Sequence, residues 1–189
     1  MWLIVGLGNP GEQYAATRHN VGFWVIDELF RSQKDSGSFQ NAWSGLSAKV
    51  SLQGEPALLL KPQTYMNRSG ESVQPAAAFY KISPDKIIVI HDDMDLPLGD
   101  VRVKRGGGHG GHNGLRDIIG RLGPDFIRVR FGIGKPAIKG TEADYVLSGF
   151  SKKEQDTSRE QIHTASEAVG LILEKGVETA QQKFNGKKV

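Results

Sequence analysis

The sequence predicts an α/β fold, a single-domain three-layer sandwich in which a twisted, mostly parallel or mixed sheet has helices on both faces. Three observations predict it. Short apolar runs of strand length alternate with segments of helical periodicity along the whole chain. No internal repeat or linker divides residues 1–189. A chain of 189 residues is also long enough to bury one sizeable core.

In the first half of the chain, the spacing of apolar residues separates strands from helices. An almost wholly apolar run is typical of a buried strand, and apolar residues three and four apart are typical of an amphipathic helix. A polar stretch rich in Gly and Ser indicates a loop or an irregular edge. By these criteria we expect, in order, a strand at 2–7, a helix at about 20–31, a loop or irregular edge at 32–47, strands at 48–52 and 57–60 joined by a turn, and a helix at 73–80.

The second half adds residues that begin and end helices. Ser151 and Glu154 have the spacing of a capping box, in which each side chain bonds the backbone N–H of the other residue, so a long helix should begin there. Gly176 is a plausible end for it. The elements expected in this half are a β-branched strand at 86–90, an edge strand at 101–104, a helix at 115–122, a strand at 126–133 and a helix at 151–176.

The composition excludes several classes of protein. The chain has no cysteine, which excludes disulfides, thiolate nucleophiles, Fe–S clusters and cysteine-bound zinc. No apolar run approaches the roughly 18–20 residues that a membrane helix needs. The apolar N-terminus has no basic leader before it, which is not typical of a signal peptide. We therefore expect a soluble cytoplasmic protein.

The positive charge is concentrated in one part of the chain. Residues 96–140 hold nine Lys and Arg and three Asp, a net charge of +6, whereas residues 1–95 carry −2 and residues 141–189 carry −1. Clustered basic residues suit a polyanion, because each neutralised phosphate releases condensed counterions. The alternative is an ordinary basic face that keeps the protein in solution.

The segment Gly6-Leu-Gly-Asn-Pro-Gly11 matches the G-x-G-x-x-G pattern of dinucleotide-binding folds directly after a strand. Two details count against that interpretation. Helical periodicity begins only near residue 20, and the acidic residues Asp27 and Glu28 fall inside a helix rather than at the end of a second strand. The glycines are also explained by a tight turn after the first strand.

His19 and Asp92 are the candidates for acid–base chemistry. His19 lies just before the helix at 20–31, where the helix dipole disfavours imidazolium and should keep the ring neutral. Asp92 follows the most apolar strand, at the strand end where sites form in open α/β sheets. A carboxylate there could orient an imidazole, as in hydrolytic triads. The alternatives are a polar helix start and a solvated acidic turn.

Residues 106–114 contain six glycines in nine positions and lie inside the basic stretch. Such a loop lets backbone N–H groups approach a phosphate closely. An alternative for this part of the protein is a metal site. The candidate ligands are His109, His112, Asp92, Asp93 and Asp95. A histidine on so glycine-rich a loop is poorly fixed for that task, so we expect no metal. Asn67 and Asn113 each begin a helix, where asparagine is a favoured cap, so structure alone could explain both, and Asn9 suits a turn.

Taken together, these motifs resemble those of the bacterial-type peptidyl-tRNA hydrolase family. The resemblance covers residues 1 to about 150, in the family's order. It is carried by Gly6-Leu-Gly-Asn9-Pro-Gly11, Tyr14-x-x-Thr-Arg-His19-Asn-x-Gly, Lys61-Pro-x-Thr-Tyr-Met66-Asn67-x-Ser-Gly, His-Asp92-Asp-Met-Asp-Leu-Pro, Gly-Gly-His-Asn113-Gly-Leu-Arg-Asp and Arg130-Phe-Gly-Ile-Gly134-Lys-Pro.

The resemblance implies an enzyme that hydrolyses the ester between a peptide and the 3′-terminal ribose of tRNA, without a cofactor, a metal or a covalent intermediate. It implies that His19 is the catalytic base and that Asp92 fixes its tautomer. Asn9 and Asn67 would hold the acceptor end, Asn113 would position the water or the peptide, and Tyr14 and Met66 would line the same crevice. For the tRNA phosphates we expect Arg102, Lys104 and Arg105. It also suggests a monomer with no obligate protein partner.

Two other functions compete with this one. A nucleotide-cofactor enzyme would use the glycine turn at 6–11 to hold a dinucleotide. A non-catalytic RNA-binding module on the same fold would keep the basic stretch but would not need His19, Asp92 and the three asparagines.

Overall fold

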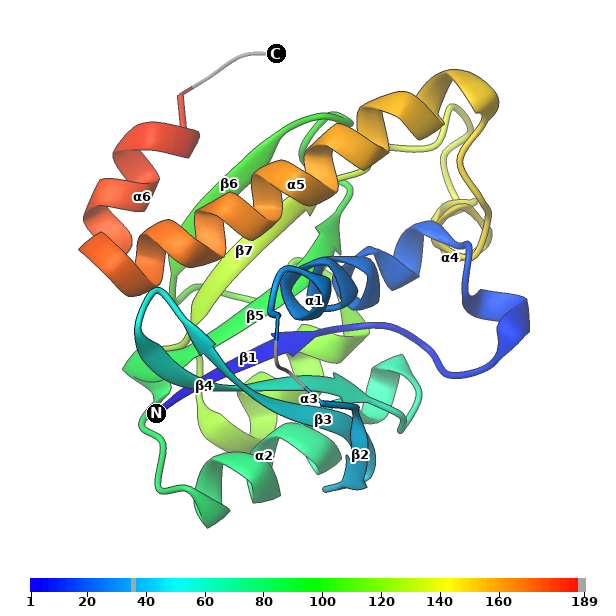
Figure 1. Ribbon diagram of the computed structural model, residues 1–189. Helices are drawn as coiled ribbons and strands as arrows, with labels where there is room; N and C mark the ends of the chain where they lie inside the picture. The colour runs from blue at the N-terminus through cyan, green and yellow to red at the C-terminus, as the bar shows by residue number, and fades with distance from the viewer. Residues whose placement is uncertain (35–36, 187–189) are drawn as a thin grey trace.

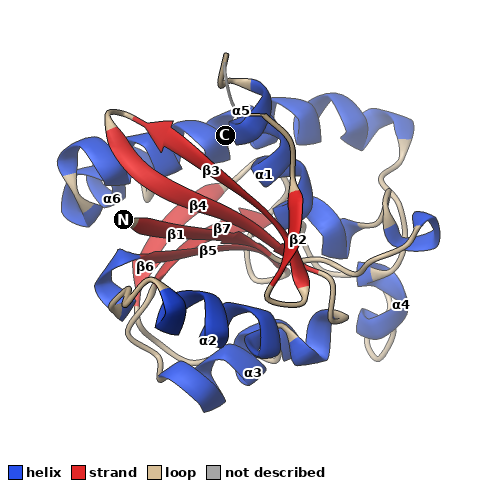
Figure 2. Cartoon of the chain, turned by 60° about the horizontal axis from the view of Figure 1, so that its bottom comes forward, coloured by secondary structure: helices blue, strands red, loops and turns tan. Residues whose placement is uncertain are grey.

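The computed structural model describes residues 1–34 and 37–186, and its seven strands form one sheet between two layers of helices (Figures 1 and 2). The strands are β1 (Trp2–Gly6), β2 (Gln40–Ala42), β3 (Gly45–Leu52), β4 (Glu55–Pro62), β5 (Ile87–Asp93), β6 (Val101–Arg105) and β7 (Ile127–Gly132). The helices are α1 (Val21–Arg31), α2 (Gly70–Phe79), α3 (Asn113–Leu122), α4 (Glu142–Val146), α5 (Lys152–Lys175) and α6 (Val177–Phe184). The predicted fold class is confirmed.

The strand order is β2-β3-β4-β1-β5-β7-β6. Strands β4, β1, β5 and β7 run parallel, and antiparallel β3 and β6 flank them. After β1 the chain builds the β2–β4 side of the sheet and then returns to place β5 on the other side of β1. The order therefore reverses between β1 and β5, and ligands bind open α/β sheets beyond the carboxyl ends of strands at such a reversal.

The core has two parts because both faces of the sheet are covered. Helices α1, α5 and α6 pack on one face, and α2 and α3 pack on the other (Figure 2). Neighbouring residues of one strand alternate between them: Leu59 of β4 lies in the first cluster, whereas Leu58 and Leu60 lie in the second. Strands buried on both faces read as continuous apolar runs, which is why the sequence predicted them without alternation.

The structure differs from the predicted elements in the segment 32–47 and near the C-terminus. β2 and the start of β3 occupy part of the predicted loop, of which residues 35 and 36 lie outside the described residues. Gly176 does end α5, but its positive φ of 89° turns the chain directly into α6. The Asn185 side chain then bonds the backbone N–H and C=O of Val103, both at 2.7 Å, and so pairs with edge strand β6.

Two of the expected helix caps are wrong. Asn67 lies inside a short 3-10 helix, Met66–Arg68, and Ser69 precedes α2. Asn113 is the first residue of α3, and the cap is His112, whose ring accepts the N–H groups of the first turn. A neutral imidazole can accept these N–H groups as an asparagine side chain does, but histidine is not one of the residues preferred at helix N-caps, so the sequence did not indicate it.

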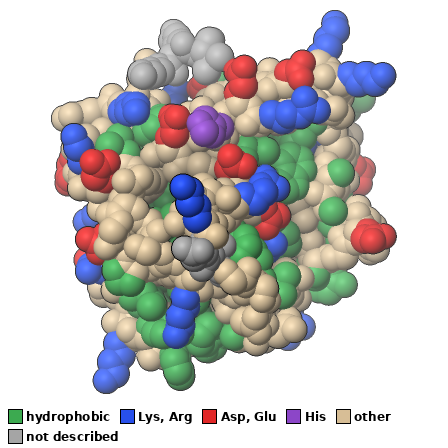
Figure 3. Space-filling model, in the orientation of Figure 1, with side chains coloured by type: hydrophobic (Ala, Val, Ile, Leu, Met, Phe, Trp, Pro, Cys, Tyr) green, Lys and Arg blue, Asp and Glu red, His purple; other side chains and the backbone are tan. Residues whose placement is uncertain are grey.

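The surface around α1 and α5 mixes acidic and basic side chains instead of gathering one sign (Figure 3). Several of them form pairs, such as Glu28 with Arg31 and Asp156 with Arg159. Within the part of the chain that the structure describes, no helix is both long and apolar enough to cross a membrane.

Candidate active site

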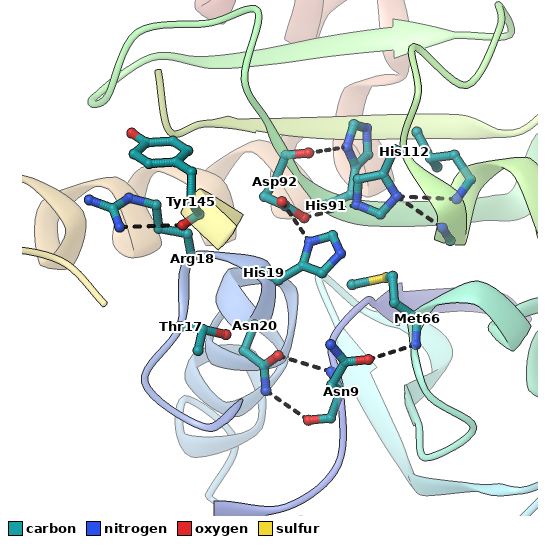
Figure 4. Close-up of polar contacts among 12 residues, drawn as sticks. Asn9, Thr17, Arg18, His19, Asn20, Met66, His91, Asp92, His112 and Tyr145 are labelled. Atoms are coloured by element: carbon teal, nitrogen blue, oxygen red, sulfur yellow. Dashed lines mark hydrogen bonds and ion pairs between the residues drawn. The ribbon is translucent and has the colours of Figure 1, made fainter. Parts of the chain in front are cut away.

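His19 and Asp92 meet where β1 and β5 end. His19 lies in a 3-10 helix, Arg18–Asn20, that leads into α1. Asp92 is the second-last residue of β5. Gly6 pairs with Ile90, so the segment that leaves β1 begins beside the end of β5. The Nδ1 atom of His19 is 2.8 Å from Oδ2 of Asp92 (Figure 4). The Asp92 side chain is buried, and that of His19 is 12% exposed, so a small part of the ring faces solvent.

A second histidine holds the other oxygen of the same carboxylate. His112 Nε2 is 2.8 Å from Asp92 Oδ1. Its Nδ1 atom accepts the N–H groups of Gly114 and Leu115 at 3.2 and 3.3 Å. Because Nδ1 accepts these hydrogen bonds, the proton of the neutral ring is on Nε2, and Nε2–H donates a hydrogen bond to Asp92. Asp92 is thus fixed at both oxygens. The sequence had placed His112 only among candidate metal ligands.

The two histidines keep Asp92 ionised. Burial alone would raise the pKa of Asp92, but the charges of His19 and His112 and their hydrogen bonds outweigh that effect and hold the pKa well below 3.8. Burial lowers the pKa of His19, whereas the Asp92 charge and hydrogen bond raise it by more, so it lies above the ordinary 6.5. The expectation that the helix dipole keeps His19 neutral is therefore wrong in direction, because a carboxylate at 2.8 Å outweighs it.

His91 precedes Asp92 and does not take part in this pair. Its Nδ1 atom donates to the backbone carbonyl of Asp92 at 2.9 Å, so the neutral ring has its lone pair on Nε2. Burial, and then the charge of His112, lower the pKa of His91 to about 4. His91 therefore stays neutral near pH 7.

Asn9, Asn20 and Met66 form a hydrogen-bonded chain on the other side of His19 (Figure 4). Asn20 bonds both the backbone N–H and the C=O of Asn9 at 2.9 Å. The Oδ1 atom of Asn9 accepts the backbone N–H of Met66 at 2.7 Å. This contact leaves the Asn9 NH₂ group to donate to a bound molecule. Asn20 was missed from the sequence, although it directly follows His19.

The other predicted site residues differ in burial, and Asn9, Tyr14, Met66 and Asn67 are not among the residues that line the cavity containing His19 and Asp92. Met66 is buried, and Asn67 beside it is exposed. Tyr14 is half-buried, and its ring meets that of Tyr65 edge-on with centroids 6.3 Å apart. Asn113, His19, Asp92 and His112 line one cavity of about 800 Å³. The structure thus brings His19, Asp92 and Asn113 to one cavity. Asn9 and Met66 are hydrogen-bonded to each other and, through Asn20, to the helix that carries His19, and Asn67 follows Met66 in the chain.

The same cavity extends into the basic stretch. Lys104 on β6 lines it, together with Arg128, Arg130, Lys135 and Lys139. Arg102 and Lys104 alternate with buried Val101 and Val103 on β6, and Arg102 lies 3.6 Å from Asp100. Arg105 is exposed but is not among the cavity-lining residues. Of the three predicted phosphate contacts, Lys104 is therefore the one that the structure joins to the site.

The glycine-rich loop is better fixed than its composition suggests. Arg128, buried on β7, donates to the carbonyls of Gly107 and Gly108, and its guanidinium lies 4.5 Å from the centre of the Phe126 ring. These contacts fix the start of the loop, and His112 near its end contacts Asp92. The expectation that the loop histidines are poorly fixed is wrong for His112, because Asp92 holds one nitrogen of its ring and the N–H groups of Gly114 and Leu115 hold the other.

A metal ion is not needed to explain the histidines. Among the described residues, one group has metal-ligand geometry: His19, Asp92 and His112, with donor atoms within 4.8 Å of one another. Each histidine nitrogen in it already faces its own carboxylate oxygen at 2.8 Å. Of the ligands proposed from the sequence, His109, Asp93 and Asp95 lie outside the group.

A histidine paired with a buried carboxylate at the strand ends of an α/β sheet is an arrangement typical of the hydrolytic class of site. Comparison with known proteins gives the family. The family model described as Peptidyl-tRNA hydrolase matches residues 3–189. The chain belongs to the peptidyl-tRNA hydrolase family, as its motifs indicated.

Relatives match along nearly the whole chain. The peptidyl-tRNA hydrolase of Sorangium cellulosum is 50% identical over 98% of this chain and 84% of its own length. That of Haemophilus influenzae is 44% identical over 99% of this chain and 97% of its own. The crystal structure of peptidyl-tRNA hydrolase from Acinetobacter baumannii superposes with a TM-score of 0.92 at 43% identity, over 100% of this chain and 96% of that one.

Proposed function

We propose that this enzyme hydrolyses the ester between a peptide, or an N-blocked aminoacyl group, and the 3′-terminal ribose of tRNA, with His19 as general base. The observation that carries the proposal is the contact between His19 Nδ1 and Asp92 Oδ2 at 2.8 Å. Asp92 is ionised, so it accepts a hydrogen bond from Nδ1–H of His19, which leaves Nε2 of the neutral ring as the basic atom.

In the proposed reaction, a water molecule gives its proton to His19 Nε2 while its oxygen attacks the ester carbon. The ribose oxygen then leaves and takes up the proton from His19. General-base catalysis of this kind contributes about 10²–10⁴-fold to a rate. Asp92 stabilises the imidazolium that forms between the two steps, and His112 keeps Asp92 in place at 2.8 Å. An ester is reactive enough that this route involves neither a metal nor a covalent intermediate.

Asparagine amides would stabilise the charge on the carbonyl oxygen. The Asn9 NH₂ group is left to donate because its Oδ1 atom is occupied by the Met66 N–H. Asn113 lines the cavity with His19 and would position the water or the peptide. Asn67, with Asn9, would hold the acceptor end, and Tyr14 and Met66 would border it. Donors placed at a developing oxyanion are worth roughly 3–4 kcal/mol in other enzymes.

The tRNA body would lie against the basic stretch. Lys104 lines the cavity and is exposed, which suits a phosphate contact, and Arg102 and Arg105 on the same strand would extend it. We propose that the enzyme acts as a monomer without an obligate protein partner. Because its proposed substrate is a tRNA, we propose that the enzyme acts in the cytoplasm.

The test is turnover of N-acetyl-aminoacyl-tRNA by the purified protein, followed as release of the N-acetyl amino acid. The enzyme is first dialysed against EDTA, and Mg²⁺ alone is returned for the tRNA. We expect full turnover. No release from the blocked substrate would refute the proposed activity, and release restored only by Zn²⁺ or Mn²⁺ would refute the metal-free route.

The competing functions make different predictions. A dinucleotide enzyme should bind NAD or FAD tightly in calorimetry. The chain after β1 passes through short 3-10 helices before α1 begins at Val21, so the segment 6–11 does not lead into an α-helix whose N-terminus could bind a phosphate. A non-catalytic RNA-binding module should bind the blocked substrate without releasing the amino acid.

A further inference from the structure

We propose that Arg18 is a positioning residue that clamps the segment 145–154 onto the short helix carrying His19, and so fixes the His19 ring against Asp92. The proposal deepens the proposed function and rests on His19 as the base. Arg18 and Asn20 flank His19 in the chain, and both are buried and anchored. The Asn20 side chain bonds the backbone of Asn9, and the Arg18 side chain bonds the segment 145–154.

The Arg18 guanidinium makes an unusual number of contacts with one segment. Its Nη1 atom donates to the Gly149 carbonyl at 2.7 Å, to the Tyr145 carbonyl at 3.5 Å and to the Ser148 hydroxyl. Its Nη2 atom donates to the Glu154 carboxylate at 3.1 Å. The plane also stacks on Tyr145, with 4.2 Å from Cζ to the ring centre, and on Phe150, at 5.1 Å.

The backbone reinforces the same attachment. The Arg18 N–H donates to the Ser148 carbonyl at 3.0 Å, and Thr17 forms an isolated antiparallel bridge with Gly149. Glu154 accepts the Ser151 N–H at 2.9 Å in the capping box of α5, so the clamp also reaches the start of that helix. One arginine thus joins residues more than 120 positions away to the neighbour of the candidate base.

The clamped segment is a wall of the active-site cavity. Glu142, Ala143 and Val146 of α4 line the cavity that also contains His19 and Asp92. The Arg18 side chain contacts Tyr145, Ser148, Gly149 and Phe150, which lie at the end of α4 and directly after it. The same wall is also attached by the Thr17 and Arg18 backbone contacts, by the Tyr145 hydroxyl, which donates to the Ile133 carbonyl at 2.6 Å, and by the Phe150 ring, whose centre lies 5.7 Å from that of Trp24. Loss of the Arg18 side-chain contacts would remove the bonds that join Tyr145, Ser148, Gly149 and Glu154 to the His19 helix, and should let this wall and that helix move relative to Asp92.

Arginine is required for this role because of its shape. A guanidinium is a planar fork that can donate to several acceptors and stack on rings at the same time, whereas an ammonium is a point charge on a flexible stem. Lysine at position 18 would keep the charge beside Glu154 but could not hold Tyr145, Ser148 and Gly149 together. Displacement of a catalytic group by about 1 Å can cost up to about 10²-fold in rate.

The experiment measures kcat, KM and the pH profile of kcat/KM on N-acetyl-aminoacyl-tRNA for Arg18→Lys and Glu154→Gln, with Tm for each variant. Arg159→Lys is the matched control, because Arg159 is an exposed arginine on α5 paired only with Asp156. We expect Arg18→Lys to lower kcat about tenfold with KM within about threefold of wild type. The acidic limb of the profile should move to lower pH, because His19 loses part of the contact with Asp92 that raises its pKa. Glu154→Gln should change kcat in the same direction by less.

A purely structural role would lower Tm and leave kcat and the acidic limb of the folded enzyme unchanged, and that result would overturn the proposal. A rise in KM alone would overturn it too. If Arg18→Lys does not fold, the same measurements on Glu154→Gln decide the question. His19→Ala is included in the assay so that the two ideas separate: full activity in His19→Ala refutes the base, whereas an inactive His19→Ala beside a fully active Arg18→Lys refutes only the clamp.

Discussion

At the scale of single residues, the site depends on one carboxylate shared by two histidines. Asp92 fixes the proton of His19 on Nδ1 and raises its pKa, while His112 keeps Asp92 from turning away. The three side chains are largely or wholly buried, with exposed fractions of 12%, 3% and 9% for His19, Asp92 and His112. Their electrostatic interactions are therefore weakly screened by solvent.

The substitution Asp92→Asn tests the role of that carboxylate. The amide is nearly isosteric but neutral, so His19 can adopt the wrong tautomer and loses the charge that raises its pKa. We expect kcat to fall by about 10²–10⁴-fold. Because His19 must be neutral to act as a base, the acidic limb of the pH–rate profile should shift to lower pH. An unchanged pH profile would contradict the assignment of Asp92.

At the scale of elements, the close approach of α1 and β1 places His19. A Cβ atom on Gly22 would lie 2.4 Å from the Leu7 backbone nitrogen, and one on Gly6 would lie 2.1 Å from the Gly22 carbonyl oxygen. Both contacts are with backbone, which cannot move aside as a side-chain end can. Only glycine at both positions lets the N-terminal end of α1 sit against the end of β1, and the residues just before α1 include His19.

Gly22→Ala should therefore destabilise the fold, by about 1–3 kcal/mol or more in the free energy of unfolding. Gly120→Ala on α3 is the matched control, because nothing lies within 4 Å of a Cβ there. In the control we expect a gain of about 0.5–1 kcal/mol, as for other helical glycines replaced by alanine. Equal stability of the two variants in denaturant unfolding would contradict the packing argument.

Most of the fold could be predicted because its strongest elements are the most apolar. The four parallel strands and the long α5 have clear patterns and caps, and their positions were predicted closely. β2 is exposed and polar, α4 has five residues, and α6 begins immediately after a glycine stop. Such elements depend on tertiary contacts, such as that of Asn185 with β6, which local patterns do not contain.

The site was predicted in part, for a similar reason. His19, Asp92 and the three asparagines stand in motifs that a sequence displays directly. Asn20, Arg18 and His112 act through partners that are 11 to 136 positions away, so their roles require the fold. The direction of the His19 pKa shift was predicted wrongly, because the helix dipole was considered without the charge of Asp92, a residue 73 positions away whose contact distance only the fold gives.

At the scale of the whole molecule, basic side chains of one sequence segment gather at one cavity. The surface around α1 and α5 mixes both signs (Figure 3), whereas the +6 segment brings Lys104, Arg128, Arg130, Lys135 and Lys139 to the active-site cavity. A tRNA bound at the cavity would meet this basic side. Three of these cations already have partners: Arg130 pairs with Asp93 at 2.8 Å, Lys135 pairs with Asp95 at 3.4 Å, and Arg128 bonds the glycine-rich loop. Lys104 and Lys139 are therefore the better candidates for phosphate contacts.

Lys104→Gln tests this arrangement. We expect weaker binding of tRNA and a slope of log K against log salt that is reduced by about one, as for loss of one phosphate contact. Lys152→Gln is the control, because Lys152 is exposed at the start of α5 and does not line the cavity. The same salt slope in both variants would contradict a phosphate contact at Lys104.

The central claim is that His19 removes the proton from the attacking water. Single-turnover hydrolysis of N-acetyl-aminoacyl-tRNA by His19→Ala, with tRNA affinity measured on the same preparation, tests it most directly. We predict a rate lower by about 10²–10⁴-fold, with affinity within about threefold of wild type. A rate equal to that of wild type in a variant that binds tRNA normally would contradict the account.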